Sequence, residues 1–224
     1  MRPLVTIVDD ALPAQQHRAL KAAIVKLGTE RIVAGYQTTF WHPLGAPPSN
    51  CVEQAVEVLA ARLSGALRGL PPVTGVEWWL SRKRTSNVKV DFHRDRDNAR
   101  FDETGEERHP VISSLLYLGA CRGGLLAVTR EDPHPDNLAC APDVHDFDFV
   151  TPRANRFTFF DGALTHGVLD AQNAIPGGRL RREKGLRLAI AVNFWAERPW
   201  KVSSFGESRH YRSLAPRSPR GLKS

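Results

Sequence analysis

The chain has 224 residues, of which 42% are hydrophobic and 25% are charged, and its formal net charge at pH 7 is +7. This length is enough for one substantial domain with a hydrophobic core and hardly enough for two. The composition is that of a globular protein, and no apolar run approaches the roughly 20 residues of a membrane span, so we expect no membrane insertion.

Two helices are expected in the first third of the chain. The segment from Leu4 to Asp9 predicts a short strand, and a helix is expected after it, through about Leu27. The second helix has clearer signals. Asn50 can cap its first turn, Glu53 completes a capping box, and VEQAVEVLAARLSGAL carries apolar residues at helical spacing.

From about Gly75 the pattern changes to short strands separated by Gly, Pro, Asn and Asp. Eight such runs follow one another: GVEWWLSRK, NVKVDFH, PVISSLLYLG, GLLAVTR, HDFDFV, NRFTFFD, THGVLD and GLRLAIAVNFW. Two helices before eight strands favour one antiparallel barrel or jelly roll with helices packed outside it. We expect a single domain over residues 1–206, with helical support in 1–74 and the jelly-roll core in 75–200.

The C-terminal segment explains part of the positive charge. From Glu207 onward the chain has five basic residues against one acid, and it is rich in Pro, Ser and Gly. Such a composition predicts a disordered tail over 207–224 that serves solubility more often than recognition.

The cysteines and the N-terminus bear on the compartment. The three cysteines (Cys51, Cys121 and Cys140) are widely spaced, which argues against a disulfide framework and against a thiolate zinc site. The N-terminal stretch reaches acidic residues after a short apolar run, which does not fit a signal peptide. We therefore expect a cytoplasmic protein.

His93 and Asp95 follow a strand pattern in VKVDFHRDRD. Val88, Val90 and Phe92 alternate with polar residues, and a continuing strand would direct His93 and Asp95 to the same face. A second His-x-Asp pair, at His134 and Asp136, lies between two prolines in EDPHPDN, where regular strand geometry is excluded. We therefore expect the first pair to be the one that is held rigidly.

His166 is the third member of the predicted site. It follows the apolar strand NRFTFF and a glycine turn, and it opens the short strand THGVLD. A single histidine on a strand is ordinarily a packed core residue. Two imidazoles and one carboxylate that converge inside a barrel instead form a 2-His-1-carboxylate triad, which holds Fe(II) and leaves three coordination positions open.

The last strand has two different faces. Leu188, Ile190, Val192 and Phe194 alternate with Arg187, Ala189, Ala191 and Asn193. An arginine followed by two alanines on one face places a permanent cation beside empty space. Such an arrangement suits a small dicarboxylate, whose carboxylate a guanidinium can bind with two hydrogen bonds. The alternative is a surface arginine on an edge strand.

Taken together, these motifs resemble the Fe(II)/2-oxoglutarate-dependent oxygenases, especially their prolyl-hydroxylase-like branch. The shared order is His-x-Asp, Tyr-Leu-x, Gly-Gly with a strand, Phe-Phe-Asp…His and an arginine on the final strand, over roughly residues 75 to 196. The resemblance implies a double-stranded β-helix with His93, Asp95 and His166 as iron ligands. It also implies that Arg187 binds the distal carboxylate of 2-oxoglutarate and that Tyr117 assists it.

The implied activity is hydroxylation of an unactivated C–H bond in a small molecule, an amino acid or a peptide side chain. The implied cofactors are Fe(II), 2-oxoglutarate as cosubstrate and O2, with ascorbate as a stimulant; succinate and CO2 are the coproducts. Arg187 follows His166 by 21 positions, which is about twice the usual gap in the family. Arginines in the intervening loop remain rivals for the anion-binding role: Arg179, Arg181 and Arg182.

Two other functions remain as alternatives. A nucleic-acid demethylase of the same fold would suit the sequence pI near 9.7. Such relatives, however, carry a second arginine six residues after the first on the last strand, where this chain has Asn193. A metal-binding jelly-roll protein without oxygenase activity would have no need of a dicarboxylate pocket beside Arg187.

The substrate is left open by the sequence, and so is the oligomeric state. The polar segment from Arg94 to His109 is expected to be a loop at the rim of the site. Its acidic residues Asp97, Asp102 and Glu103 are candidates to bind an amine or a guanidinium, although loop acids are more often merely solvated. Aromatic residues that could line a pocket, but are more often core, are Tyr36, Phe40, Trp41, Trp78 and Trp79.

Overall fold

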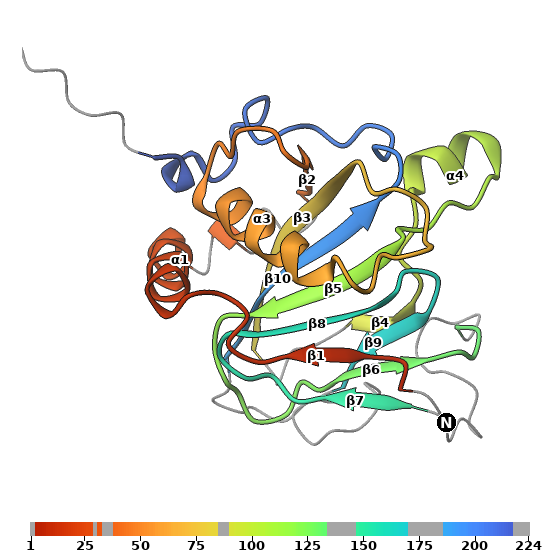
Figure 1. Cartoon of the computed structure of the whole chain (residues 1–224), viewed down its shortest axis with the longest axis horizontal. Coiled ribbons are helices and arrows are strands. Elements are labelled where there is room, and N and C mark those ends of the chain that lie inside the picture. The colour runs from red at the N-terminus through yellow and green to blue at the C-terminus, as the bar shows by residue number, and fades with distance from the viewer. Residues whose placement is uncertain are drawn as a thin grey trace, which may run out of the picture.

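The computed structural model describes residues 3–28, 31–32, 38–84, 90–133, 147–169 and 186–216. This part of the chain is mostly antiparallel β-structure with three α-helices on its periphery (Figure 1). The helices are α1 (Ala14–Leu27), α3 (Cys51–Leu63) and α4 (Asn98–Thr104). The strands are β1 (Thr6–Val8), β2 (Phe40–Pro43), β3 (Gly75–Arg84), β4 (Val90–His93), β5 (Ile112–Tyr117), β6 (Leu126–Thr129), β7 (Asp148–Val150), β8 (Arg156–Asp161), β9 (Thr165–Val168) and β10 (Leu186–Trp195). In the described ranges, no helix has the length and apolar content needed to cross a membrane.

The strands form two antiparallel sheets. The larger has the order β1-β8-β5-β10-β3-β2, and the smaller has the order β4-β9-β6-β7. A cluster of buried apolar side chains from both sheets joins them, including Tyr117 and Ala189 of the larger sheet and Leu126 and Val128 of the smaller. The predicted fold class, mainly β and jelly-roll-like with flanking helices, is confirmed at this level.

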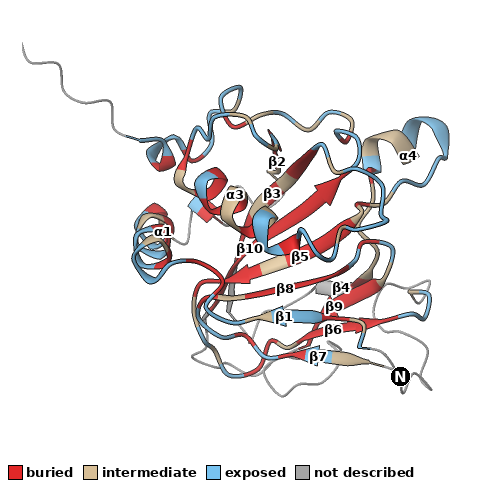
Figure 2. Ribbon diagram, viewed as in Figure 1, coloured by how far each residue is buried: buried red, intermediate tan, exposed pale blue. Residues whose placement is uncertain are grey.

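Two helices cover the outer face of the larger sheet (Figures 1 and 2). Helix α3 begins directly after Asn50, whose side-chain oxygen accepts the backbone N–H groups of Val52 and Glu53. The Glu53 carboxylate accepts the backbone N–H of Ser49 at 2.6 Å, one residue before the cap that a standard capping box would use. Apolar side chains at helical spacing then face the sheet: Val52, Val56, Leu59 and Leu63 from α3, and Leu20, Ile24 and Leu27 from α1.

The two faces of strand β10 have different surroundings. Leu188, Ile190, Val192 and Phe194 belong to the core beneath the helices. The alternate face carries Arg187 and Ala191 toward the smaller sheet, where they line a cavity. The two-face pattern in the sequence is therefore confirmed.

The N-terminal part of the chain is not helical support alone. Strand β1 pairs with β8 at one edge of the larger sheet, and β2 pairs with β3 at the other. The rings of Phe40 and Trp78 lie 4.6 Å apart across that second pair. Short strands before and after residue 75 therefore belong to the same sheet.

The expectation of a disordered tail from residue 207 is wrong for residues 207–216. Tyr211 and Leu214 are buried in the core, and the Tyr211 hydroxyl donates a hydrogen bond to the carbonyl oxygen of Ile32 at 3.4 Å. A short 3-10 helix, Arg212–Leu214, holds them in place. The prediction relied on the composition of the segment, in which basic and small residues far outnumber Tyr211 and Leu214. Residues 217–224 lie outside the described ranges.

The polar segment after β4 was expected to be a rim loop and instead contains α4. Asp97 caps this helix by accepting the backbone N–H of Arg100, and Gly105 ends it in the left-handed conformation at φ 70°. The segment lacks an apolar stripe, so hydrophobic periodicity could not predict the helix; its capping residues could have.

Candidate metal centre

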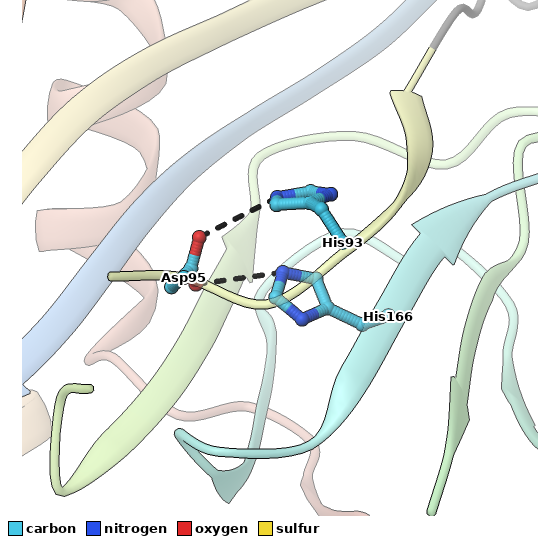
Figure 3. Close-up of side chains that lie close together, drawn as sticks. All are labelled: His93, Asp95 and His166. Atoms are coloured by element: carbon cyan, nitrogen blue, oxygen red, sulfur yellow. Dashed lines mark ion pairs between the residues drawn. The ribbon is translucent and has the colours of Figure 1, made fainter. Parts of the chain in front are cut away.

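His93, Asp95 and His166 converge as predicted (Figure 3). His93 ends β4 and lies directly opposite His166 of the neighbouring strand β9. Asp95 follows two residues after His93, where the chain leaves the sheet. The Nε2 atoms of His93 and His166 lie 3.5 Å and 3.4 Å from the two carboxylate oxygens of Asp95.

The hydrogen bond made by His166 leaves its Nε2 atom available. Its Nδ1–H donates to the backbone carbonyl of Leu164 at 3.1 Å, because a carbonyl can only accept. Burial lowers the pKa of His166 below its ordinary value, although the Asp95 carboxylate opposes this change. The ring is therefore neutral at pH 7, with the Nε2 lone pair directed at the centre of the cluster.

The Asp95 carboxylate is anionic and fixed in place. Burial raises its pKa, but the imidazoles of His166 and His93 and the hydroxyl of Ser113 outweigh burial, so the net pKa lies below the ordinary value. Ser113 of β5 donates its hydroxyl to the carboxylate at 2.8 Å, and His109 Nδ1–H donates to the backbone carbonyl of Asp95 at 2.7 Å. Neither residue was predicted from the sequence, although the polar pair inside the apolar run PVISSLLYLG was a signal for Ser113.

The donor set fits a divalent metal ion. The three ligand atoms, one from each residue, all lie within 4.8 Å of one another. Two imidazole nitrogens and one carboxylate on one side of an ion are the donors that non-haem Fe(II) takes in a facial triad. Asp95 has the outer hydrogen bonds that orient a metal-ligating carboxylate, and His166 has the one that orients an imidazole.

A cavity of about 130 Å³ extends from the triad into the space between the sheets. It is smaller than the roughly 300–1,000 Å³ of typical drug-sized ligand sites, so it suits only a small molecule. His166 and Asp95 line it together with Ala191, and Arg187 contributes the cation that the sequence placed there. We call this space the smaller cavity.

Arg187 is held rigidly at this cavity with 3% of its surface exposed. Its Nε–H donates to the carbonyl of Gly124 at 3.1 Å, and its Nη2–H donates to the Tyr117 hydroxyl at 3.3 Å. Burial raises the pKa of Tyr117, although the Arg187 charge opposes this change, so the hydroxyl stays protonated and can donate to an anion. Tyr117 and Arg187 are thus together, as the resemblance implied.

A second cavity of about 430 Å³ adjoins the triad. We call it the larger cavity. It shares four lining residues with the smaller one, namely Trp79, His93, Asp95 and Asn193. It also contains Glu77 and Trp195, which the sequence analysis did not select. A molecule in the larger cavity can therefore reach the triad without entering the smaller cavity.

The acidic residues considered earlier as amine-binding groups have other positions. Asp97 is buried and accepts the backbone N–H of Trp200 at 2.9 Å in addition to capping α4. Glu103 pairs with Lys201, and Asp102 is exposed. Of the aromatic candidates, Trp79 lines both cavities, whereas Phe40 and Trp78 belong to the core and Trp41 is buried.

Two sets of predicted alternatives lie outside the described residues: the second His-x-Asp pair, His134 and Asp136, and the arginines Arg179, Arg181 and Arg182. Tyr36 and Cys140 lie outside them as well. The anion-binding role of Arg187 is argued from its position in the smaller cavity.

Comparisons with known proteins show what the fold is similar to. No family model matches the sequence, and no curated protein matches it. A prolyl-4-hydroxylase from Pseudomonas putida matches with a TM-score of 0.52 at 20% identity, covering 86% of this chain and 88% of that one. HygX from Streptomyces hygroscopicus, with nickel and 2-oxoglutarate bound, matches with a TM-score of 0.50 at 14% identity, over 85% of this chain and 81% of that one. A viral collagen prolyl hydroxylase from Paramecium Bursaria Chlorella virus-1 matches with a TM-score of 0.50 at 14% identity, over 88% and 95%. The chain therefore has the fold seen in 2-oxoglutarate- and Fe(II)-dependent oxygenases.

Proposed function

We propose that this protein is an Fe(II)- and 2-oxoglutarate-dependent oxygenase that hydroxylates a C–H bond and releases succinate and CO2. The observation that carries the proposal is one continuous arrangement. The donor set of His93, Asp95 and His166 lies at one end of the smaller cavity, and the buried Arg187 also lines that cavity. A metal binder without oxygenase activity has no use for a buried cation in a space that fits a small dicarboxylate.

The architecture supports the finer form of this proposal. The two antiparallel sheets would be those of a double-stranded β-helix, with α1 and α3 as its helical support, and the chain would act as a single domain. The three solved structures above share this overall fold, and one of them has 2-oxoglutarate bound. In this proposal the domain extends through residue 216, because Tyr211 and Leu214 belong to its core.

Each residue then has a role that follows from its contacts. His93, Asp95 and His166 would hold Fe(II), and Ser113 would keep the Asp95 carboxylate in place. Arg187 and the Tyr117 hydroxyl would bind the distal carboxylate of 2-oxoglutarate. When bound, iron would activate O2, which is the oxidant, and 2-oxoglutarate would supply two of the four electrons that O2 takes up, as 2-oxoglutarate is converted to succinate and CO2; the substrate supplies the other two. Apolar side chains of the smaller cavity, Leu126, Phe160 and Val168, would shield that chemistry from bulk water.

The proposal is tested by succinate formation. The purified protein with Fe(II), 2-oxoglutarate and O2 should form succinate, and a chelator should stop the reaction. His166→Ala should lower the rate by more than about a hundredfold, because even residues that only orient metal ligands cost 10–100-fold when they are changed. The same change at the exposed His210 is the matched control and should have no effect. Succinate formation at the wild-type rate in His166→Ala would refute the assignment.

A further inference from the structure

The larger cavity adjoins the triad and is lined by several charged residues. Its volume of about 430 Å³ falls within the range of small-molecule sites. Two arginines line it, but both are already paired. Arg94 forms an ion pair with Asp132, and Arg96 Nη1 lies 3.8 Å from Glu107 Oε1. Both arginines therefore have acidic partners of their own, and neither forms an ion pair with Glu77.

Glu77 is the remaining carboxylate of the larger cavity. Asp95 belongs to the triad, and Glu107 is paired with Arg96. Among the described residues, no basic side chain lies within ion-pair distance of Glu77. The largest effects on its pKa come from burial, the Thr39 hydroxyl, Asp95, Asp97 and Trp195, none of which is a cation.

Two indole rings flank this carboxylate. Glu77 lies opposite Asn193 in the pairing of β3 with β10, so Trp79 and Trp195 follow on the same face, one on each strand. Both rings line the larger cavity. The Trp195 side chain is buried, with 3% exposed, and its Nε1–H has no hydrogen-bond partner in the described structure. Indole rings and a carboxylate that line one cavity are groups that can bind an organic cation.

The electrostatics of the larger cavity point in the same direction. Burial raises the pKa of Glu77 to about 7, and the charges of Asp95 and Asp97 add to this effect. The Thr39 hydroxyl opposes it, as does the Trp195 indole N–H, which approaches the carboxylate without completing a hydrogen bond. A bound cation would offset the cost of ionising this carboxylate.

Building on the function proposed above, we propose that the larger cavity binds a small substrate that carries an amine or guanidinium group, through an ion pair with Glu77. The shared lining residues Trp79, His93, Asp95 and Asn193 would place the rest of that substrate beside the triad. The nitrogen and the oxidised carbon would then be different parts of one small molecule.

The test uses matched pairs of probes that differ in charge. Pentylamine is compared with 1-pentanol, and butylguanidine with butylurea, by ligand-observed NMR on the full chain without iron or 2-oxoglutarate. Each cation should bind at least about tenfold more tightly than its neutral partner. Glu77→Gln should weaken cation binding by roughly 10- to 100-fold, the equivalent of a hydrogen bond to a charged group. Glu77→Asp keeps the charge and should retain part of the affinity.

Two further variants separate this site from its surroundings. Glu107→Gln removes the same charge from the same cavity, but from a carboxylate already paired with Arg96, and should change cation binding by less than about threefold. Asp95→Asn removes the rival carboxylate of the triad. In the Asp95→Asn background, adding Glu77→Gln should still weaken cation binding by the same factor. Because binding is measured without iron, failure of the oxygenase proposal would not affect this result.

Three outcomes would overturn the inference. The cations could bind no more tightly than their neutral partners. Glu77→Gln could leave their binding unchanged while thermal unfolding shows that the variant is folded. Finally, Asp95→Asn alone could abolish the preference for cations, which would place the bound cation at the triad and not at Glu77.

Discussion

The two cavities beside the triad are built in different ways. The smaller cavity is lined largely by strands of the two facing sheets, and Arg187 in it projects from the central strand β10. The larger cavity combines strand residues with Thr39, the segment after β4, Asn98 of α4 and Pro133. A site made by alternating strand residues leaves its pattern in one short run of sequence. A site assembled from several distant segments does not.

Arg187 and Glu77 illustrate this difference. Both are charged residues inside apolar strands of the larger sheet. Arg187 stood out because two alanines follow it on the same face, which indicated space beside a cation. Glu77 lies between bulky residues in GVEWWLSRK, and its environment comes from Thr39, Trp195 and the triad, all distant in sequence. The surroundings of Glu77 that suggest cation binding exist only in the folded chain, where these segments meet.

The largest effect is expected on 2-oxoglutarate affinity in Arg187→Met, which keeps the side-chain bulk and removes the cation from the smaller cavity. Loss of one partner of a buried, hydrogen-bonded charge pair costs about 2–5 kcal/mol. The affinity for 2-oxoglutarate, measured by calorimetry on the metal-loaded protein, should fall by roughly 30-fold to several thousand-fold. Arg187→Lys should give an intermediate affinity, because lysine keeps the positive charge but cannot form the two parallel hydrogen bonds of a guanidinium.

The matched control for this change is Arg18→Met on the exposed side of α1, which should have no effect. Metal binding should survive in Arg187→Met, since no ligand is changed. If Arg179, Arg181 or Arg182 gives the large defect instead, the anion site has been assigned to the wrong residue.

A smaller effect is expected from Ala191→Val, which adds two methyl groups to the smaller cavity only. Overpacking a close-fitted site costs about 1–3 kcal/mol, so 2-oxoglutarate affinity should fall by roughly 5- to 150-fold. Binding of pentylamine in the larger cavity should change little, because Ala191 does not line it. Ala196→Val at an exposed position is the control. Equal losses of both ligands would mean that the cavities are not separable.

The smallest effect concerns stability. The pKa of Glu77 is raised in the folded protein to about 7 from 4.5, so the folded state binds this proton more tightly than the unfolded state. Stability should therefore fall as pH rises from about 4.5 to 7. Glu77→Gln cannot ionise and should be more stable than wild type at pH 8 by about 1–2 kcal/mol, allowing for solvent screening of a half-buried group. At pH 4 the two should unfold at the same denaturant concentration; a less stable variant at pH 8 would indicate that the ionised Glu77 has a structural partner.

The sequence predicted those features whose determinants are local. The start of α3 followed from Asn50, and the faces of β10 followed from strict alternation. The triad followed from a His-x-Asp pair at the end of one strand and a histidine on another, although the expected continuation of the strand to Asp95 was wrong, because β4 ends at His93. Helix α4 was missed because it carries no apolar stripe, although Asp97 and Gly105 define its ends. The C-terminal anchors Tyr211 and Leu214 were missed because only their contacts with distant core residues distinguish them from a polar tail.

The central claim is that the triad and Arg187 hold one iron and one 2-oxoglutarate in the same site. The most direct test is anaerobic spectroscopy, in which 2-oxoglutarate is added to protein loaded with Fe(II) and the visible charge-transfer absorption of the iron-bound keto acid is recorded. We predict a band that saturates at one equivalent, is absent in His166→Ala and Asp95→Ala, and requires higher 2-oxoglutarate in Arg187→Met. A wild-type protein that gives no band, or a band of equal strength in the triad variants, would contradict the account.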